Sequence, residues 1–283
     1  MAIPVVGDYT SNTATDSASL TLTKPAGVQV GDFLLILVGN DNDTSTNQWD
    51  DVTYKPEGFT LIAEAGDTAS DSHIAAFYRI ADGSEGETID VPAESAMDYW
   101  GFYTRVSGVR PTNPIDGFKA SPTVAATYID LLGVGTDVDD CLAFYLQAFD
   151  GADGGGFIAS DTGWSKTAEI EANPGSPVGA SGSWGTKEMP TAGATGTVRI
   201  ANVAVLKDGW CGFQFTIAPP AYYHGFSVQG VGELALCSVG NNPLRIRKGG
   251  TTYGLELVKI TEDYASAVRI KTPVGIRAIR KYT

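Results

Sequence analysis

The chain has 283 residues, with 19 Lys and Arg, 33 Asp and Glu and only 2 His, and 43% of its residues are hydrophobic. This length gives an ample core for one large all-β domain or two smaller domains, and the hydrophobic content argues against a disordered chain. The longest apolar runs, Phe33–Val38 and Cys141–Leu146, are too short for a transmembrane helix, and the net charge of −14 argues against nucleic acid or a membrane as a partner.

Glycine makes up 34 of the 283 residues, which predicts many tight turns and few long helices. Ser19–Thr23 alternates polar and apolar residues, as a half-buried strand does, and Lys24–Gly27 is typical of a turn. The unbroken apolar run Phe33–Val38 predicts a central strand that is buried on both faces. Further strands are predicted at Phe59–Ile62, His73–Ile80, Thr88–Val91 and Tyr99–Val106, with a turn at Asp82-Gly83.

The second half of the chain repeats landmarks of the first half in the same order, which indicates an internal duplication. The closest echo is between Tyr99–Val109 and Tyr222–Val231. The other echoes pair Val30–Leu35 with Val138–Leu146, Glu57–Thr60 with Thr162–Ser165, the strand before Asp82-Gly83 with Ile200–Leu206, and Thr88–Pro92 with Phe215–Pro219.

Each half offers strands with apolar faces that it cannot bury alone. Packing the halves face to face buries both, which predicts a jelly-roll-like two-sheet β-sandwich over residues 1–232, with halves at about 19–110 and 133–232. Crossover helices between strands are missing, so a parallel α/β sheet is not expected. The Gly-rich stretch Gly151–Gly193 reads as a long loop at one end of the sandwich, either a lip that contacts a partner or a tolerated insertion.

The last part of the chain, residues 233–283, reads as a small β-meander with one apolar and one basic side. It is too short for an independent core, so it is expected to pack on the sandwich, on a second subunit or on another protein. Residues 1–220 hold 10 Lys and Arg against 29 Asp and Glu, a balance of −19, whereas residues 221–283 hold 9 against 4, a balance of +5. The basic end either complements its own acidic body or docks on an acidic neighbour. The candidate docking residues are Arg245, Arg247, Lys248, Arg269, Lys271, Arg277 and Arg280.

Two groups of residues resemble a known class of protein. Lys24–Leu35, Glu57–Thr60, Tyr78–Gly83 and Ser107–Val109 resemble β-sandwich proteins of tailed bacteriophages. Leu244–Leu257, and Val268–Thr272 through Ala278–Lys281, are similar to the C-terminal module of phage head or tail surface proteins. The resemblance implies a virion component, assembled in the host cytoplasm, whose partners are other capsid or tail proteins and further copies of itself. Head decoration, fibre and tail positions stay open, and the resemblance carries no catalytic residues across.

The residues with possible chemistry give no strong signal for an enzyme, a cofactor or a metal. Asp41-Asn42-Asp43 has alternating oxygen ligands but fails the EF-hand spacing, and His73 and His224 belong to no motif. The three cysteines, Cys141, Cys211 and Cys237, read as buried thiols.

The aromatic residues offer an alternative function. Trp49, Trp164 and Trp184 fall near predicted loops, where indole rings stack on sugars. The alternative hypothesis is therefore an adhesin that binds a host-surface glycan.

Overall fold

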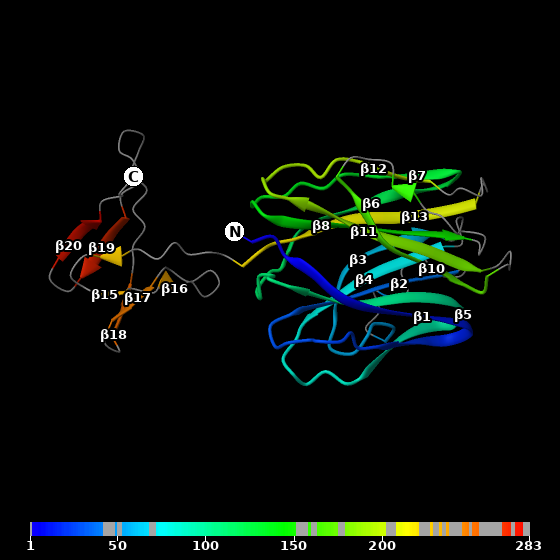
Figure 1. Ribbon diagram of the computed structural model, residues 1–283, viewed down its shortest axis with the longest axis horizontal. Helices are drawn as coiled ribbons and strands as arrows, with labels where there is room; N and C mark the ends of the chain where they lie inside the picture. The colour runs from blue at the N-terminus through cyan, green and yellow to red at the C-terminus, as the bar shows by residue number, and fades with distance from the viewer. Residues whose placement is uncertain are drawn as a thin grey trace. The chain divides into compact units, whose positions relative to one another are not determined.

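The computed structural model describes residues 2–41, 49, 53–67, 72–150, 158–159, 163–174, 179–201 and 208–220, and, further along, the backbone of short strands between Ser227 and Ile279. Every regular element in these residues is a β-strand (Figure 1), which confirms the all-β class. No helix among them is long and apolar enough to cross a membrane. The chain divides into two compact units, residues 1–220 and 221–283, so the first unit ends before the predicted boundary at 232.

Two five-stranded antiparallel sheets form the first unit, and each comes from one half of the chain. The first sheet has the order β1 (Val5–Thr23), β5 (Thr88–Ser107), β2 (Phe33–Asn40), β4 (Ser72–Ile80) and β3 (Thr60–Asp67). The second sheet has the order β6 (Ile115–Ala126), β13 (Asp208–Ile217), β8 (Cys141–Asp150), β11 (Ala180–Met189) and β10 (Ser165–Ala172).

The two sheets have the same topology. In each, the first and last strands of the half are neighbours, followed by the second, fourth and third strands in chain order. The shared topology makes β1 equivalent to β6, β2 to β8, β3 to β10, β4 to β11 and β5 to β13. The two-sheet sandwich built from two similar halves is thus confirmed, although the halves cover residues 5–107 and 115–217 instead of 19–110 and 133–232.

The sandwich core lies between the two sheets. Phe33, Leu35 and Leu37 of β2 pack in one cluster with residues of β8 that face them, namely Leu142, Phe144 and Leu146. Aromatic rings extend this contact, because Phe144 stacks on Phe215 with ring centroids 4.9 Å apart. Alternate side chains of a strand point to opposite faces, so this cluster accounts for only half of each apolar run.

The other half of each run is buried on the outer face of its sheet. In the first half, the strands β1 and β5 are long and continue past the sheet, and Ser17–Thr23 stays paired with Thr88–Met97. Leu20 and Leu22 from this extension are fully buried. They pack, with Val91, against the outward residues of β2, which are Leu34, Ile36 and Val38. This second layer explains why Phe33–Val38 carries no polar residue.

A small separate sheet covers the second sheet in the same way. Its strands are β7 (Tyr128–Leu131), β12 (Val198–Ala201) and β9 (Ile158–Ala159). Fully buried Gln214 of β13 fixes this cover to the sheet below. Its Nε2 donates to the carbonyl oxygens of Leu131 (2.9 Å) and Gly196 (3.0 Å), and its Oε1 accepts from Thr195 Oγ1 (2.6 Å). Every polar atom of this buried amide therefore has a partner.

The topology corrects the closest sequence echo. The strand equivalent to Tyr99–Val106 lies in β13, and Tyr222–Val231 falls beyond the first unit. Gly101 and Phe102 lie opposite Val38 and Leu37 of β2. In the second half, Gly212 and Phe213 lie opposite Gln147 and Leu146 of β8. They are therefore the equivalents of Gly101 and Phe102. Likewise, Ile200 belongs to the cover strand β12 and not to a counterpart of β4.

The Gly-rich stretch Gly151–Gly193 is also not a single loop. Strands β10 and β11 run through it and form an edge of the second sheet. Gly182 of β11 has no side chain where a large side chain of the opposite sheet, Trp100, occupies the space: a Cβ atom on Gly182 would lie 2.1 Å from the Trp100 ring. The glycine at this position reflects packing and not a turn.

Seven short strands make up the described part of the second unit. They are β14 (Ser227–Val228), β15 (Gly232–Glu233), β16 (Leu236–Cys237), β17 (Arg245–Lys248), β18 (Thr251–Gly254), β19 (Val268–Thr272) and β20 (Gly275–Ile279). Strands β16, β17 and β18 form one antiparallel sheet, and β19 and β20 form a hairpin. The predicted small β-unit thus has strands at the basic segments.

Candidate functional site

The candidate docking residues fall on three strands of the second unit. Arg245, Arg247 and Lys248 are in β17, Arg269 and Lys271 in β19 and Arg277 in β20, while Arg280 lies outside the described residues. The register pairs Arg269 with Ala278 and Ile270 with Arg277. Directly paired residues of a hairpin share a face, and neighbours alternate. Positions 269 and 277 therefore fall on opposite faces in the backbone register of the hairpin.

The three candidate tryptophans for sugar stacking are buried. Trp49 and Trp184 are 0% exposed, and Trp164 is 8% exposed. Trp184 lies in the sandwich core on β11, and Trp49 packs edge-on against Phe77 on the outer face of the first sheet. Sugar stacking requires an accessible ring face, so the expectation of accessible rings at these positions is wrong. The polar segments near these tryptophans in the sequence did not indicate whether each indole is exposed or buried.

The structure describes only some of the remaining candidate residues. His73 is fully buried in β4, and His224 lies outside the described residues. Asn42 and Asp43 of the Asp-Asn-Asp segment also lie outside them. Within the described part of the chain, no group of three or more His, Cys, Asp or Glu is placed to hold a metal ion.

A groove that the sequence did not reveal opens at one end of the first half. We call it the end groove. It has a volume of about 660 Å³ and lies between the loop that joins β1 to β2, residues 24–32, and the loop that joins β4 to β5, residues 81–87. Its lining residues are Thr10, Lys24, Pro25, Ala26, Gly27, Val28, Gln29, Val30, Gly83, Glu85 and Glu87.

Backbone hydrogen bonds join the two loops at both ends of the groove. At one end, the amide of Lys24 donates to the carbonyl of Glu87 at 2.8 Å. At the other end, the amide of Gly31 donates to the carbonyl of Ala81, and the amide of Ala81 to that of Asp32, each at 2.8 Å. The loops are thus held at two points and separate between them.

An ion pair between Asp32 and Arg105 holds the first loop in place. The carboxylate of Asp32 lies 3.2 Å from the Arg105 guanidinium of β5 and also accepts from the amide of Gln29 at 2.9 Å. The side chains of Asp32 and Arg105 are only 9% and 25% exposed. A carboxylate with both a charged and a backbone donor is firmly positioned, so this loop has a fixed shape before any partner binds.

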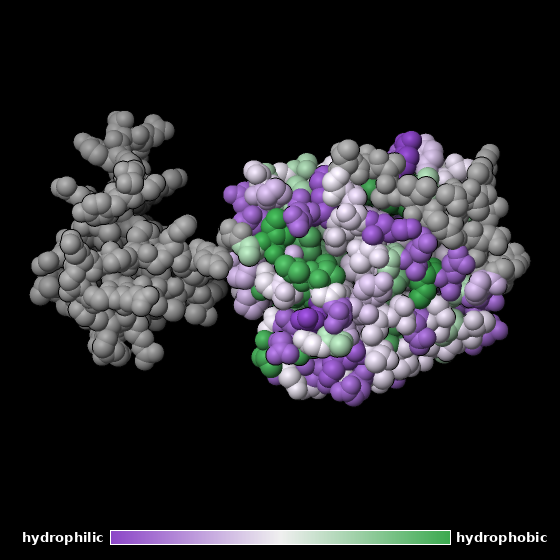
Figure 2. Space-filling model, in the orientation of Figure 1, coloured by the Kyte–Doolittle hydropathy of each residue, from purple (hydrophilic) through white to green (hydrophobic). Residues whose placement is uncertain are grey.

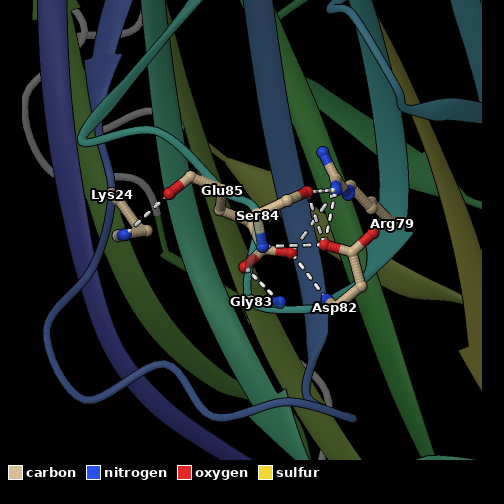
Figure 3. A network of polar contacts seen from close by, with 6 residues as sticks. All are labelled: Lys24, Arg79, Asp82, Gly83, Ser84 and Glu85. Atoms are coloured by element: carbon tan, nitrogen blue, oxygen red, sulfur yellow. Dashed lines mark hydrogen bonds and ion pairs between the residues drawn. The ribbon is translucent and has the colours of Figure 1, made fainter.

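A polar network fixes the second loop (Figure 3). The Asp82 carboxylate accepts from the Ser84 hydroxyl at 2.6 Å, from the Ser84 amide at 2.8 Å and from Arg79 at 2.9 Å. These donors, with the Ser84 hydroxyl first, lower the pKa of Asp82 to about 2. Because the pKa is lowered on folding, the stabilising contribution is present above the ordinary value near 4 and is lost only as the pH falls towards about 2.

The charged side chains that line the groove differ in their contacts and in how far they are exposed. Glu85 turns into its own loop, where its carboxylate accepts from the amides of Asp82 (2.7 Å) and Gly83 (3.0 Å). Lys24 Nζ contacts the carbonyl oxygen of Glu85 at 3.0 Å and a carboxylate oxygen of Glu87 at 3.4 Å. The Lys24 side chain is only 20% exposed, but that of Glu87 is 90% exposed. The groove therefore presents mainly negative charge to the outside.

The equivalent loops of the second half are joined differently. They are residues 132–140, before β8, and residues 190–197, after β11. Gly135 and Ala194 form a β-bridge, the amide of Thr136 donates to the carbonyl of Gly193, and the amide of Thr195 to that of Val134, both at 2.8 Å. The two loops are hydrogen-bonded along their middle, where the first half has its groove. The fold itself therefore does not require an opening at this position.

Sequence reasoning recognised both walls of the groove only as turns. Lys24–Gly27 and Asp82-Gly83 lie more than fifty residues apart, and the groove depends on the pairing of β2 with β4 that brings them together. The signal that was present is the sequence Val28-Gln29-Val30, which places two valines in the connection between β1 and β2. Comparisons of the chain with protein-family models, with curated proteins and with solved structures find no match.

The buried tyrosines and Cys141 predict a loss of stability at alkaline pH. Burial raises the pKa of Tyr103 and of Cys141 to about 12, and burial also raises the pKa of Tyr99 and Tyr145. A raised pKa means that the fold favours the neutral form, so the contribution is complete below the ordinary tyrosine value near 10 and is lost as the pH rises through about 12. We expect these tyrosines to ionise together with unfolding. Parallel alkaline titrations by near-ultraviolet absorbance and circular dichroism test this, and full tyrosine ionisation in a folded protein would contradict it.

Proposed function

We propose that the chain is a non-enzymatic structural protein of a tailed-phage virion, a head decoration or fibre-type protein that attaches to the particle through protein contacts. The observation that carries this proposal is the match between charge and domain structure. The chain divides after Pro220, and the balance of charge changes at the same place, from −19 in residues 1–220 to +5 in residues 221–283. A small basic unit appended to a strongly acidic body fits attachment to an acidic neighbour.

Electrostatic attraction would guide the second unit to its partner but would contribute little to the affinity. An exposed ion pair contributes about 0–1 kcal/mol, so most of the affinity has to come from apolar contact in the second unit or between copies of the chain. The isoleucines that alternate with the basic residues, Ile246, Ile270 and Ile276, offer such contact. Homo-oligomers on the particle are part of the proposal, because repeated copies multiply weak contacts.

The test is to delete residues 221–283 and to measure how much protein remains with sedimented particles. We expect particle-associated protein to fall by about tenfold or more, equivalent to at least ~1.4 kcal/mol of attachment free energy. Circular dichroism should show an unchanged β-sandwich, because the first unit has its own cores. Undiminished association of the truncated chain would contradict the proposal.

A second variant separates the effect of the positive charge from the effect of losing the whole second unit. Combined Arg245→Gln, Arg247→Gln and Arg269→Gln should weaken association and reduce its sensitivity to salt. The matched control removes the same number of cations from the sandwich, at Lys119, Lys166 and Arg199. Equal effects of the two triple variants would remove the second unit from the attachment role.

The glycan-binding alternative receives no support from the aromatic residues that motivated it. Among the described residues, its three candidate tryptophans are buried. A position in the tail instead of the head is compatible with the same test, because either assembly would lose the truncated chain.

A further inference from the structure

The loops that form the end groove separate between their ends in the first half, whereas the equivalent loops of the second half are hydrogen-bonded along their middle. A packing requirement of the fold would apply to both halves, since the sheets share one topology. We propose that the end groove is a docking site for an extended segment of another protein, in which aliphatic side chains alternate with Lys or Arg. This site is separate from the basic second unit, and the inference does not depend on the virion assignment.

The aliphatic part of this occupant is inferred from the groove wall. Val30 is 74% exposed, the largest exposed fraction among the large apolar side chains that the structure describes. Val28 is half-buried in the same wall, beside Pro25 and Ala26. Figure 2 shows that apolar surface also gathers at the end of the sandwich where the N-terminus lies. An aliphatic side chain in the groove would remove Val30 from water.

The cationic part is inferred from the charge of the rim. The positive groups Lys24 and Arg79 are withdrawn, with side chains 20% and 22% exposed, and both are already paired with carboxylates or carbonyl oxygens. Glu87, which lines the groove, is 90% exposed, and Asp82, which precedes the lining residue Gly83, is 63% exposed. A segment that enters the groove therefore meets outward carboxylates and no outward cation of the groove, which favours Lys or Arg over Asp or Glu.

The groove is also pre-organised. Its two loops are joined at both ends by backbone hydrogen bonds, and each is fixed internally, one through Asp32 and the other through Asp82. A site that is ordered before binding loses less conformational entropy when an extended segment enters.

The test uses the full-length chain and a fluorescent synthetic peptide, GSRIRIKSG, with the charge-reversed peptide GSEIEIESG as its control. Fluorescence anisotropy at low salt should show saturable binding of the basic peptide alone. Glu87→Lys should weaken that binding by about fivefold, the upper range for one exposed ion pair, and Val30→Ser by about tenfold. High salt should reduce the effect of Glu87→Lys and leave that of Val30→Ser.

Two matched variants control for general surface effects. Val5→Ser changes a valine that is 62% exposed in β1, and Glu188→Lys reverses an exposed charge at the end of β11. Both should bind the peptide as the wild type does. Absence of saturable binding, or equal losses in the control and groove variants, would overturn the proposal. Because these variants keep residues 221–283, failure here leaves the attachment test for the second unit unaffected.

Discussion

Trp100→Ala is expected to lower the free energy of unfolding by about 3–5 kcal/mol, the range for removing a fully buried large aromatic side chain. Trp100 is 0% exposed and belongs to the core between the sheets. Its ring lies between a glycine of each sheet: a Cβ on Gly39 would be 2.3 Å from Cζ2 of the indole, and a Cβ on Gly182 would be 2.1 Å from the same atom. With no side chains at these two positions, neither glycine can fill the cavity.

Urea unfolding measures this effect, with an unchanged dependence on denaturant as evidence that the folded state is otherwise intact. For a unit of this size, each kcal/mol corresponds to about 2–4 °C in the melting temperature. Trp100→Phe should lose less, because part of the ring volume remains. A loss below about 1 kcal/mol for Trp100→Ala would mean that the indole does not fill the space between the sheets.

Gly182→Ala is expected to destabilise the protein by about 1–3 kcal/mol or more, although alanine is normally better than glycine in a strand by about 0.5–1 kcal/mol. The sign is reversed here because the new methyl group would overlap the Trp100 ring. The ring cannot retreat, since the backbone of Gly39 lies on its other side. The backbone conformation of Gly182 is not in the left-handed region, so the cost is steric.

A double-mutant cycle isolates this contact. In the Trp100→Ala background, Gly182→Ala should cost less than about 0.5 kcal/mol or stabilise the protein, because the overlap is gone. Gly135→Ala is the matched control: nothing lies within 4 Å of its added Cβ, so it should be close to neutral. Additive effects of Trp100→Ala and Gly182→Ala would contradict the proposed packing between the sheets.

Local patterns predicted the strands with the strongest periodicity. The run Phe33–Val38 became β2, buried on both faces, and its counterpart Cys141–Leu146 became β8. The echo between them identified the duplication correctly, because a central strand buried on both faces has to be apolar throughout. The echoes that failed, at Tyr222–Val231 and at Ile200, rested on aromatic residues, glycines and turns that recur in many β-proteins and do not define a register.

The candidate site was less accessible to sequence reasoning. The end groove results from two loops that are distant in the chain, and whether they touch or separate depends on hydrogen bonds such as those of Thr136 and Gly193 in the second half. Val28 and Val30 mark one wall, but the composition of the loops does not show whether the pair touches or separates. The tryptophans illustrate the same limit, since an indole beside a polar segment can face solvent or the core, and the choice depends on packing partners such as Phe77 for Trp49 and Phe144 for Trp184.

The sequence by itself determined the all-β class, the duplication and the change of charge between residues 1–220 and 221–283, because apolar periodicity, repeated landmarks and charge are properties of the chain alone. The tertiary structure decided that each half forms one complete sheet and that long first and last strands, or a small added sheet, cover the outer faces. It also decided that Trp100 fills the space above Gly39 and Gly182 and that the two equivalent loop pairs are joined differently. These features arise from contacts between residues far apart in the chain, and such contacts leave little trace in local sequence.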